Sequence, residues 1–208
     1  MNKLSIVIID YGVGNTYSVS NAIKFLGYTK LKISDDEKLI RNADVLILPG
    51  VGAFDEAAKN LKVRNLSGIL NEEVLAKNKP ILGICLGMQL FATASEENGL
   101  HDGLNWIEGK VKKLAVPNNF AIPHVGWNDV IYNSIEPLFS RNAGQNNFYF
   151  DHSYHFDCDE MYVAAYCDYG IKVTAAVQKK NIFGVQFHPE KSQTSGLKLF
   201  RSFFNSIK

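Results

Sequence analysis

The sequence predicts an α/β fold in which a mostly parallel central sheet is flanked by helices and additional antiparallel strands follow in the second half. In the first half, short apolar runs rich in β-branched residues alternate with segments of helical periodicity, which is typical of β-α-β units. Glycine-rich turns follow two of these runs. Beyond residue 105, aromatic-containing runs follow one another with no helical segment between them, which favours antiparallel pairing.

The first expected strand covers residues 5–9 and is apolar on both faces, as a strand buried in a parallel sheet is. A glycine turn at residues 11–15 follows it, and a helix then runs up to Gly27. The apolar face of this helix is formed by Val19, Ala22, Ile23 and Leu26, which recur at helical spacing. We expect the other strands of this half at residues 31–33, 45–48 and 81–84, and helices at residues 53–61 and 66–77.

The second half predicts shorter strands and one closing helix. The strands are expected at residues 111–116, 148–152, 162–167, 173–178 and 183–187. The helix is expected at residues 196–207, where Leu197, Phe200, Phe204 and Ile207 have helical spacing. Loops are expected at residues 118–119 and 141–147. A chain of 208 residues matches one domain, so we expect a single domain over residues 1–208.

Composition narrows the classes of partner. The chain has 46% hydrophobic residues, and 22 Lys and Arg against 21 Asp and Glu give a net charge of +1. Nucleic-acid or anionic-membrane binding usually needs a basic excess, so neither partner is expected. The apolar run at residues 4–9 lacks a cleavage site, and we expect a cytoplasmic protein. Three cysteines without C-x-x-C spacing predict no disulfide framework, zinc site or other metal, and no cofactor is expected.

The sharpest local feature is Gly83-Ile84-Cys85-Leu86-Gly87, which follows an expected strand and precedes an expected helix with Met88, Leu90 and Phe91. A nucleophile between small residues at such a turn has the form of a nucleophile elbow. At the N-terminus of a helix, a thiol favours its thiolate form. The alternative is a buried cysteine that packs as a small hydrophobe; the flanking glycines favour the nucleophile.

A candidate base for this thiol lies at the end of the last expected strand, in Phe187-His188-Pro189-Glu190. Residues two apart in an extended chain point the same way, so Glu190 could orient and charge-balance the imidazole of His188. The alternative is a histidine that only satisfies hydrogen bonds at a strand end. A third element is Pro49-Gly50-Val51-Gly52, whose small residues, together with the N–H of Leu86, suit an oxyanion site.

These motifs resemble class I (triad) glutamine amidotransferases. Further motifs in the same order resemble, more closely, the glutaminase subunits of imidazole glycerol phosphate synthases. They are Asp10-Tyr11-Gly12-Val13-Gly14-Asn15, Pro123-His124-Val125-Gly126-Trp127-Asn128, His152-Ser153-Tyr154 and the run at residues 184–192. The resemblance implies the class I amidotransferase fold, which is flavodoxin-like, and hydrolysis of L-glutamine to glutamate and ammonia.

The resemblance also assigns roles to individual residues. It implies Cys85 as the nucleophile, His188 as the acid and base, and Glu190 as its orienter. Gly52 and Leu86 would form the oxyanion site. The amino-acid end of the substrate would be held by Gln89, His152, Ser153 and Tyr154.

A partner follows from the same resemblance, because in this family the chain has no acceptor site. Ammonia passes to a separate (β/α)8-barrel cyclase subunit in a heterodimer, which forms imidazole glycerol phosphate and aminoimidazole carboxamide ribotide in histidine biosynthesis. The resemblance places Asn15, Trp127 and Lys191 near the docking face. The alternatives are a core aromatic for Trp127 and a solvated charge for Lys191. We also expect low activity without the partner, with residues 49–52 as the switching element.

Two positions depart from the family pattern, and other functions stay open. Asp151 stands where a small apolar residue is usual, and Val125 where methionine is commoner. Paralogous subunits supply ammonia to surface-sugar amidation. A cysteine hydrolase on the same elbow would need Cys85 and His188 but neither the Gln89 pocket nor a partner. A redox-sensing or scaffold protein would use Cys85 only as a reactive thiol.

Overall fold

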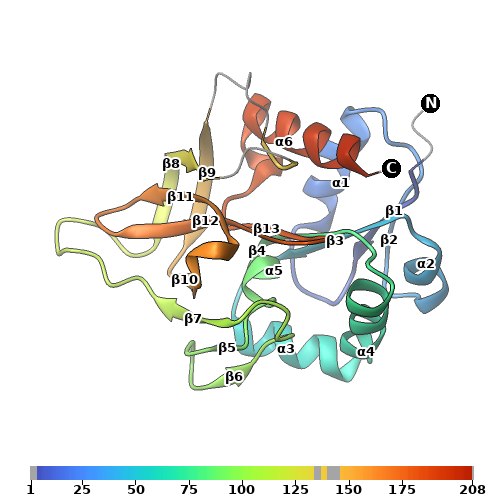
Figure 1. Cartoon of the computed structure of the whole chain (residues 1–208), viewed down its shortest axis with the longest axis horizontal. Helices are drawn as coiled ribbons and strands as arrows, with labels where there is room; N and C mark the ends of the chain where they lie inside the picture. Colours follow the sequence, from blue (N-terminus) through green and yellow to red (C-terminus); the bar gives the residue numbers. More distant parts are fainter. Residues whose placement is uncertain (1–3, 134–136, 140–145, 208) are drawn as a thin grey trace.

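The computed structural model describes residues 4–133, 137–139 and 146–207. Within these residues, nine strands form one twisted sheet in the order β2-β1-β3-β4-β13-β12-β11-β8-β9. Figure 1 shows this sheet crossing the molecule, with helices above and below it on one side and the antiparallel strands extending to the other. This confirms the α/β fold with a mostly parallel first half and antiparallel strands in the second.

The parallel part of the sheet contains the strands that the sequence predicts for the first half. Neighbouring strands from β2 to β13 run parallel, and Gly50 pairs with Cys85 at the carboxyl edge. Their side chains are almost all buried, as in parallel sheets covered on both faces. The strands are β1 (Ile6–Ile9), β2 (Leu31–Ser34), β3 (Val45–Gly50), β4 (Ile81–Cys85) and β13 (Ile182–Val185).

The rest of the sheet is antiparallel, and a smaller sheet lies beside it in the order β10-β7-β5-β6. The antiparallel strands of the large sheet are β8 (His124–Tyr132), β9 (Asn147–His152), β11 (Val163–Asp168) and β12 (Lys172–Lys179). The strands of the small sheet are β5 (Ala94–Ser95), β6 (His101–Asp102), β7 (Gly109–Lys113) and β10 (Tyr154–Cys158).

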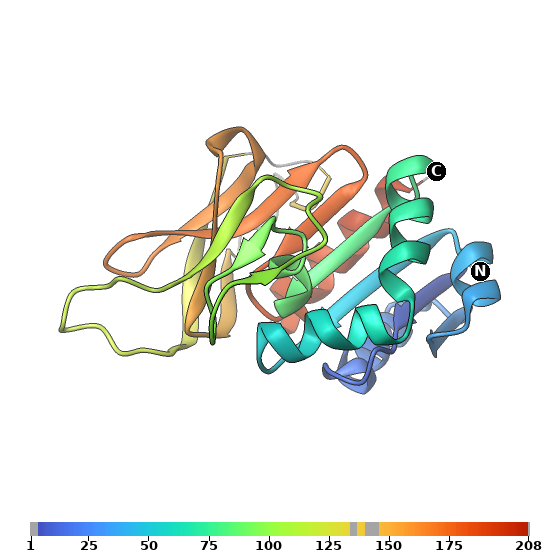
Figure 2. The ribbon, with the colours of Figure 1, turned by 90° about the horizontal axis from the view of Figure 1, so that it is seen from below.

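Helices cover both faces of the parallel strands. Because side chains alternate along a strand, Ile6 and Ile8 of β1 pack on one face with α1 and α6, while Val7 and Ile9 pack on the other with α3 and α4 (Figures 1 and 2). The helices are α1 (Thr16–Phe25), α2 (Glu37–Asn42), α3 (Phe54–Val63), α4 (Leu66–Leu70) with the π-helical turn η1 (Asn71–Ala76), α5 (Leu86–Gln89) and α6 (Gln193–Ser206). Two 3-10 turns, η2 (Glu160–Tyr162) and η3 (Pro189–Lys191), complete the elements.

Several boundaries differ from the expected ones. The last helix starts at Gln193 rather than at residue 196, and α2, β5, β6, β8 and β10 were not predicted. The turn expected at residues 118–119 lies outside helices and strands, while most of the loop expected at 141–147 lies outside the described residues. Within the described residues, no helix is long and apolar enough to cross a membrane.

Candidate active site

The elbow at Cys85 is present in the structure. Cys85 ends β4 with a φ of +53° and ψ of −113°, and α5 begins at the next residue. A left-handed φ is unfavourable for a residue with a side chain and persists only where the surroundings impose it. Such strain at a nucleophile between strand and helix is the feature that defines a nucleophile elbow.

Glycines make this turn possible. A Cβ on Gly87 would lie 1.8 Å from the carbonyl oxygen of Leu48, and one on Gly83 would lie 2.6 Å from the ring of Phe91. A Cβ on Gly50, opposite Cys85 in the sheet, would lie 2.7 Å from the Tyr11 hydroxyl. These glycines therefore allow the tight turn at Cys85 and the close approach of α5 to β3.

The helix after the elbow is much shorter than predicted. α5 ends at Gln89, and the carbonyl groups of Leu90 and Phe91 accept hydrogen bonds from residues 104, 106 and 107 instead of continuing a helix. Cys85 therefore precedes a single helical turn, whose free N–H groups are those of the predicted helix N-terminus, while the longer helix is absent. Side chains from other elements also contact the Cys85 sulfur.

His188 and Glu190 form the first of these contacts. Oε1 of Glu190 lies 2.8 Å from Nδ1 of His188, and both side chains are almost fully buried. The sequence predicted that Glu190 would reach the imidazole along an extended chain. It reaches the imidazole instead from the 3-10 turn η3. The hydroxyl of Ser192 donates to the His188 carbonyl and accepts from the N–H of Tyr149, which holds this turn against β9.

The charge on His188 follows from its neighbours. Burial alone would lower the pKa of His188, but the adjacent Cys85 thiolate and the Glu190 carboxylate raise it to about 10. A side-chain interaction with Cys85 also contributes to the raised pKa of His188. The raised pKa favours an imidazolium at His188 beside the Cys85 sulfur.

Two buried glutamines extend this arrangement. Nε2 of Gln186 donates to Sγ of Cys85 at 3.6 Å, and Oε1 of Gln186 accepts from Nε2 of Gln89 at 2.9 Å. Nε2 of Gln89 also donates to the carbonyl of Tyr154 at 2.9 Å. Both N–H groups of Gln89 are thus committed, so toward a ligand its side chain can act only as an acceptor.

A cavity of about 260 Å³ opens over Cys85. It brings together residues predicted from separate motifs: the nucleophile and base, both oxyanion candidates, and the segment that follows β9. Its lining consists of Val51, Gly52, Cys85, Leu86, Gln89, Glu97, Pro123, Asp151, His152, Ser153, Tyr154 and His188. Glu190 stands behind His188 and does not line the cavity.

The turn after β3 has a fixed and an open part. Pro49 and Gly50 belong to the strand, and the hydroxyl of Tyr11 donates to the Pro49 carbonyl at 2.6 Å. Gly52 has a φ of +101° and open space where a Cβ would be. Val51 and Gly52 line the cavity, so the segment of the turn that faces a ligand is also the one with room to move.

Glu97 is a cavity residue that the sequence analysis missed. Its Oε2 accepts from the N–H of Phe54 at 3.0 Å, at the start of α3. This hydrogen bond holds a carboxylate at the cavity wall, which suits a cationic group of a ligand. Glu97 has no local sequence signal for its role. Gln186 lies two residues before His188 in the run at residues 184–192, but the sequence analysis assigned it no role.

The three residues predicted for a docking face all lie at the surface. Asn15 caps α1 by accepting from the N–H of Ser18. Trp127 is 46% exposed and meets Tyr149 edge-on, so the alternative of a core aromatic is wrong. Nζ of Lys191 lies over the ring of Tyr149 and 3.8 Å from the carboxylate of Asp151 at the cavity rim.

Comparison with known proteins identifies the family and the fold. The family model "Glutamine amidotransferase class-I" matches residues 7–207. The chain is 49% identical to the imidazole glycerol phosphate synthase subunit HisH 2 of Vibrio vulnificus over 99% of its length and 96% of that protein. It is 46% identical to subunit HisH 1 of Campylobacter jejuni, over 95% of its length and 98% of that protein. A crystal structure of a glutamine amidotransferase, 20% identical, shares the fold with a TM-score of 0.73 over 96% of this chain and 97% of that one.

Proposed function

Because the chain belongs to the class I glutamine amidotransferase family, and within it to the HisH subunits of imidazole glycerol phosphate synthase, we propose that Cys85, His188 and Glu190 hydrolyse L-glutamine to glutamate and ammonia. The observation that carries the proposal is the strained Cys85, which opens into a cavity and is in contact with a buried His188–Glu190 pair. A cysteine that served only as packing would need neither the strain nor the pair.

The reaction starts with attack of the Cys85 thiolate on the side-chain amide carbon of glutamine. The N–H donors proposed for the developing oxyanion are the backbone groups of Gly52 and Leu86. The His188 imidazolium gives its proton to the amide nitrogen, the C–N bond breaks, and ammonia leaves a glutamyl thioester. Water then attacks this thioester as His188 takes the proton, the C–S bond breaks, and glutamate is released.

The other end of glutamine is bound by polar groups along the cavity wall. The Glu97 carboxylate and the free carbonyl oxygen of Gln89 suit the α-ammonium group. The segment of His152, Ser153 and Tyr154 takes the α-carboxylate side. A glutamine held at this end would place its amide at Cys85.

The ammonia is passed to a partner subunit, because the cavity over Cys85 has room for little beyond one amino acid. We place a (β/α)8-barrel cyclase subunit on the face that carries Asn15, Trp127 and Lys191, as a heterodimer in the cytoplasm. The complex forms imidazole glycerol phosphate and aminoimidazole carboxamide ribotide in histidine biosynthesis. The names of the relatives favour this pathway over surface-sugar amidation, and the pocket favours it over a general cysteine hydrolase.

Partner binding also controls the glutaminase. Tyr11 and the close approach of α5 hold Pro49 and Gly50, whereas Val51 is exposed and Gly52 has open space where a Cβ would be. We therefore assign the switch to the peptide groups of residues 51–52, whose reorientation completes the oxyanion site when the partner docks. Substitution of Gly52 by alanine, which strains a left-handed φ, should lower the stimulated rate at least tenfold.

The direct test of the proposal is covalent labelling by a glutamine-analogue chloroketone. Such a reagent needs both the thiolate and the amino-acid pocket. Stoichiometric labelling of Cys85, prevented by excess glutamine, is expected. If a generic alkylating reagent modifies Cys85 while the analogue does not, a reactive thiol without a glutaminase site is the better account.

A further inference from the structure

Two buried histidines lie beside the cavity and outside the triad. His124 begins β8 and His152 ends β9, and the register of these strands places them opposite each other. Nδ1 of His124 lies 3.0 Å from Nε2 of His152, and both residues are buried. His152 lines the cavity and His124 does not, so His124 can act on a ligand only through its neighbour.

The position of each proton follows from the carbonyl group of Tyr154. Nδ1 of His152 lies 2.8 Å from this carbonyl, which can only accept, so Nδ1 carries the hydrogen. Burial lowers the pKa of His152 to about 3, and the ring is therefore neutral at pH 7. Its Nε2 is then an acceptor, and Nδ1 of His124 must be the donor between the two rings.

The proton position on His124 follows in the same way. Burial lowers the pKa of His124 to about 4, so this ring is also neutral and its Nε2 accepts. The side-chain amide of Asn128 lies 3.4 Å from that nitrogen and donates to the Asp168 carbonyl at 2.9 Å. The His124 ring is further fixed by stacking on Tyr169 and Phe150, with centroid separations of 3.8 and 4.7 Å.

At the other end, this chain of hydrogen bonds reaches the substrate segment. The Tyr154 carbonyl accepts from His152 on one side and from Gln89 on the other. Gln89 in turn contacts Gln186, which donates to Cys85. The backbone at residues 152–154 is thus clamped between two side chains, one of which depends on His124 for the orientation of its ring.

We propose that His124 is a positioning residue for glutamine: its Nδ1–H holds the ring of His152, which clamps the Tyr154 carbonyl and so keeps residues 153–154 in place at the cavity. Without this donor, Nε2 of His152 is a buried acceptor with no partner, and the ring gains by turning away from Tyr154. The loss falls on substrate binding rather than on the triad, which does not touch His124. The inference rests on the proposed glutaminase function.

Three substitutions of His124 separate positioning from packing. His124→Phe keeps a flat ring for the stack and removes the donor. His124→Asn places an amide nitrogen where Nδ1 was, because both atoms are bonded to Cγ. His124→Gln carries its amide one atom further, toward the place of Nε2. Tyr169→Phe serves as the control, because it removes only the hydroxyl that donates to Ala121 and keeps the stacked ring.

The readout is the steady-state hydrolysis of glutamine by the full chain in complex with its cyclase partner. We expect a rise in KM of about tenfold for His124→Phe and His124→Gln, with kcat within about threefold of the wild type. His124→Asn should stay within about threefold of the wild-type KM, and Tyr169→Phe should leave it unchanged. A packing role predicts the opposite order, since Asn removes the most volume, whereas Phe is larger than His and removes none.

Two results would overturn the inference. One is a wild-type KM in His124→Phe, and the other is a KM in His124→Asn as high as in His124→Phe. If the wild-type complex releases no glutamate, the proposed function falls, and this inference falls with it. Nitrogen-15 spectra of the imidazoles give an independent readout: both rings should be Nδ1–H tautomers at pH 7, and an Nε2–H tautomer for either ring contradicts the chain of donors.

Discussion

Oε1 of Glu190 accepts from Nδ1 of His188 at 2.8 Å, with both side chains 2% exposed. This contact fixes the tautomer of the imidazole and leaves its Nε2 for the proton that passes between Cys85 and the substrate. Oε2 of Glu190 has no hydrogen-bond partner among the described residues. The carboxylate is therefore committed to His188, and its charge acts mainly there.

Substitution of Glu190 by glutamine tests this contact. The amide oxygen can still accept from Nδ1–H, so the tautomer survives while the charge is lost. We expect kcat for glutamine hydrolysis to fall roughly 100-fold or more, with a smaller change in KM. Glu160→Gln, which alters an exposed carboxylate in η2, is the matched control and should keep the wild-type rate. Equal rates in the two variants would remove Glu190 from the triad.

The same substitution changes the pH dependence. The Glu190 carboxylate is one of the groups that raise the pKa of His188 to about 10, so its removal lowers that pKa. The imidazolium that protonates the leaving ammonia is then lost at a lower pH. The alkaline limb of kcat/KM against pH should move to lower pH in Glu190→Gln, and a limb that stays or moves upward contradicts the assignment.

The close approach of α5 to β3 predicts a large loss of stability in Gly87→Ala. The new Cβ would lie 1.8 Å from the Leu48 carbonyl oxygen, so the elbow must shift. We expect the free energy of unfolding to fall by at least about 3 kcal/mol. Gly68→Ala in α4 is the control: its Cβ would meet nothing closer than 3.8 Å, and alanine favours the helix by up to about 1 kcal/mol. Urea unfolding monitored by circular dichroism measures both.

Removal of the Glu97 charge is expected to weaken the binding of glutamine. Glu97→Gln keeps an oxygen for the N–H of Phe54 and removes the charge proposed to meet the α-ammonium group. KM for glutamine should rise about tenfold, with kcat little changed. Its neighbour Glu96 is exposed, and its Oε1 makes only a long contact of 3.9 Å with Nζ of Lys110. Glu96→Gln should therefore leave KM unchanged. Similar KM values in the two variants would place the α-ammonium group elsewhere.

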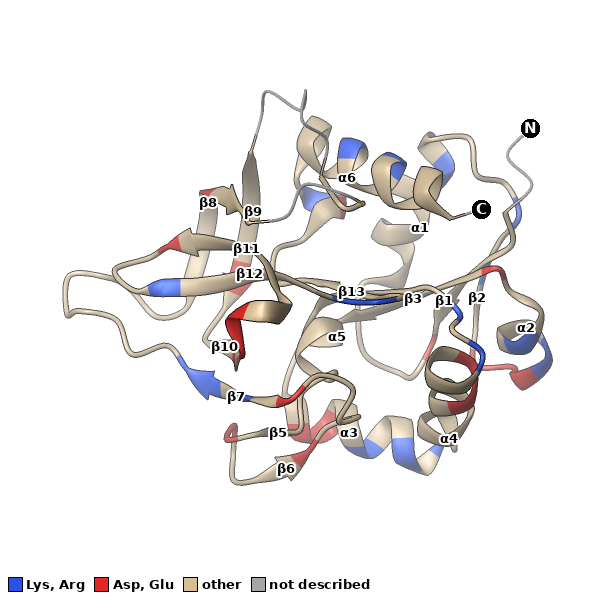
Figure 3. Cartoon of the chain, in the orientation of Figure 1, with Lys and Arg blue, Asp and Glu red and all other residues tan. Residues whose placement is uncertain are grey.

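A buried carboxylate far from the site predicts a pH-dependent stability. The Glu73 side chain is 1% exposed and pairs with Arg41, Lys77 and Lys79, where α2 and η1 meet. Figure 3 shows acidic and basic segments side by side in this region. Burial alone would raise the pKa of Glu73, but the hydrogen bonds from Lys77 and Lys79 bring it below its ordinary value. Loss of this carboxylate leaves cations without their shared partner.

Glu73→Gln should therefore lower the free energy of unfolding by about 2–3 kcal/mol at pH 7. A carboxyl whose pKa is lowered by folding stabilises the protein above its ordinary pKa, and that contribution is lost as the pH falls. The difference from the wild type should shrink below pH 4.5, the ordinary pKa of the group. Glu72→Gln, in the half-exposed member of the cluster, should have a smaller effect. A difference that does not change between pH 7 and pH 4 contradicts this account.

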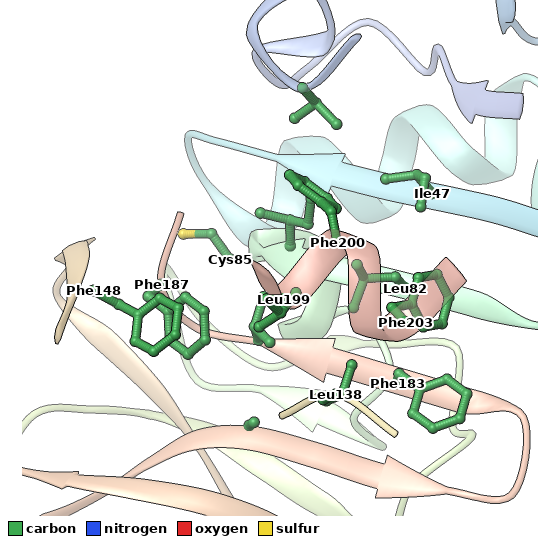
Figure 4. Close-up of a cluster of buried hydrophobic side chains, with 14 of the residues drawn as sticks. Ile47, Leu82, Cys85, Leu138, Phe148, Phe183, Phe187, Leu199, Phe200 and Phe203 are labelled. Carbon is green, nitrogen blue, oxygen red and sulfur yellow. The ribbon is translucent and has the colours of Figure 1, made fainter. Parts of the chain in front are cut away.

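Local patterns predicted the parallel strands and the elbow. β1, β3 and β4 are continuous apolar runs, and their carboxyl ends must share one edge of the sheet, which brings Gly50 and Cys85 together. Figure 4 shows Ile47 of β3 and Leu82 and Cys85 of β4 in one apolar cluster with Leu199, Phe200 and Phe203 of α6. Glycine spacing around Cys85 was informative because the steric need for it arises within a few residues.

Features that depend on distant residues escaped prediction. β8 alternates buried and exposed positions but contains Gly126, Asn128 and Asp129, which are rare in strands. α2 buries one residue, Ile40, which is too little for a periodic signal. Glu97 and Gln186 gain their roles only where the chain folds back on Cys85.

The central claim is tested most directly by glutamate release from glutamine, measured for the purified chain alone and with the barrel cyclase subunit and its nucleotide ligand from the same organism. The account predicts weak activity alone, strong stimulation in the complex, and no activity for Cys85→Ala in either state. No glutamate release in any mixture, or equal release by Cys85→Ala, would contradict it.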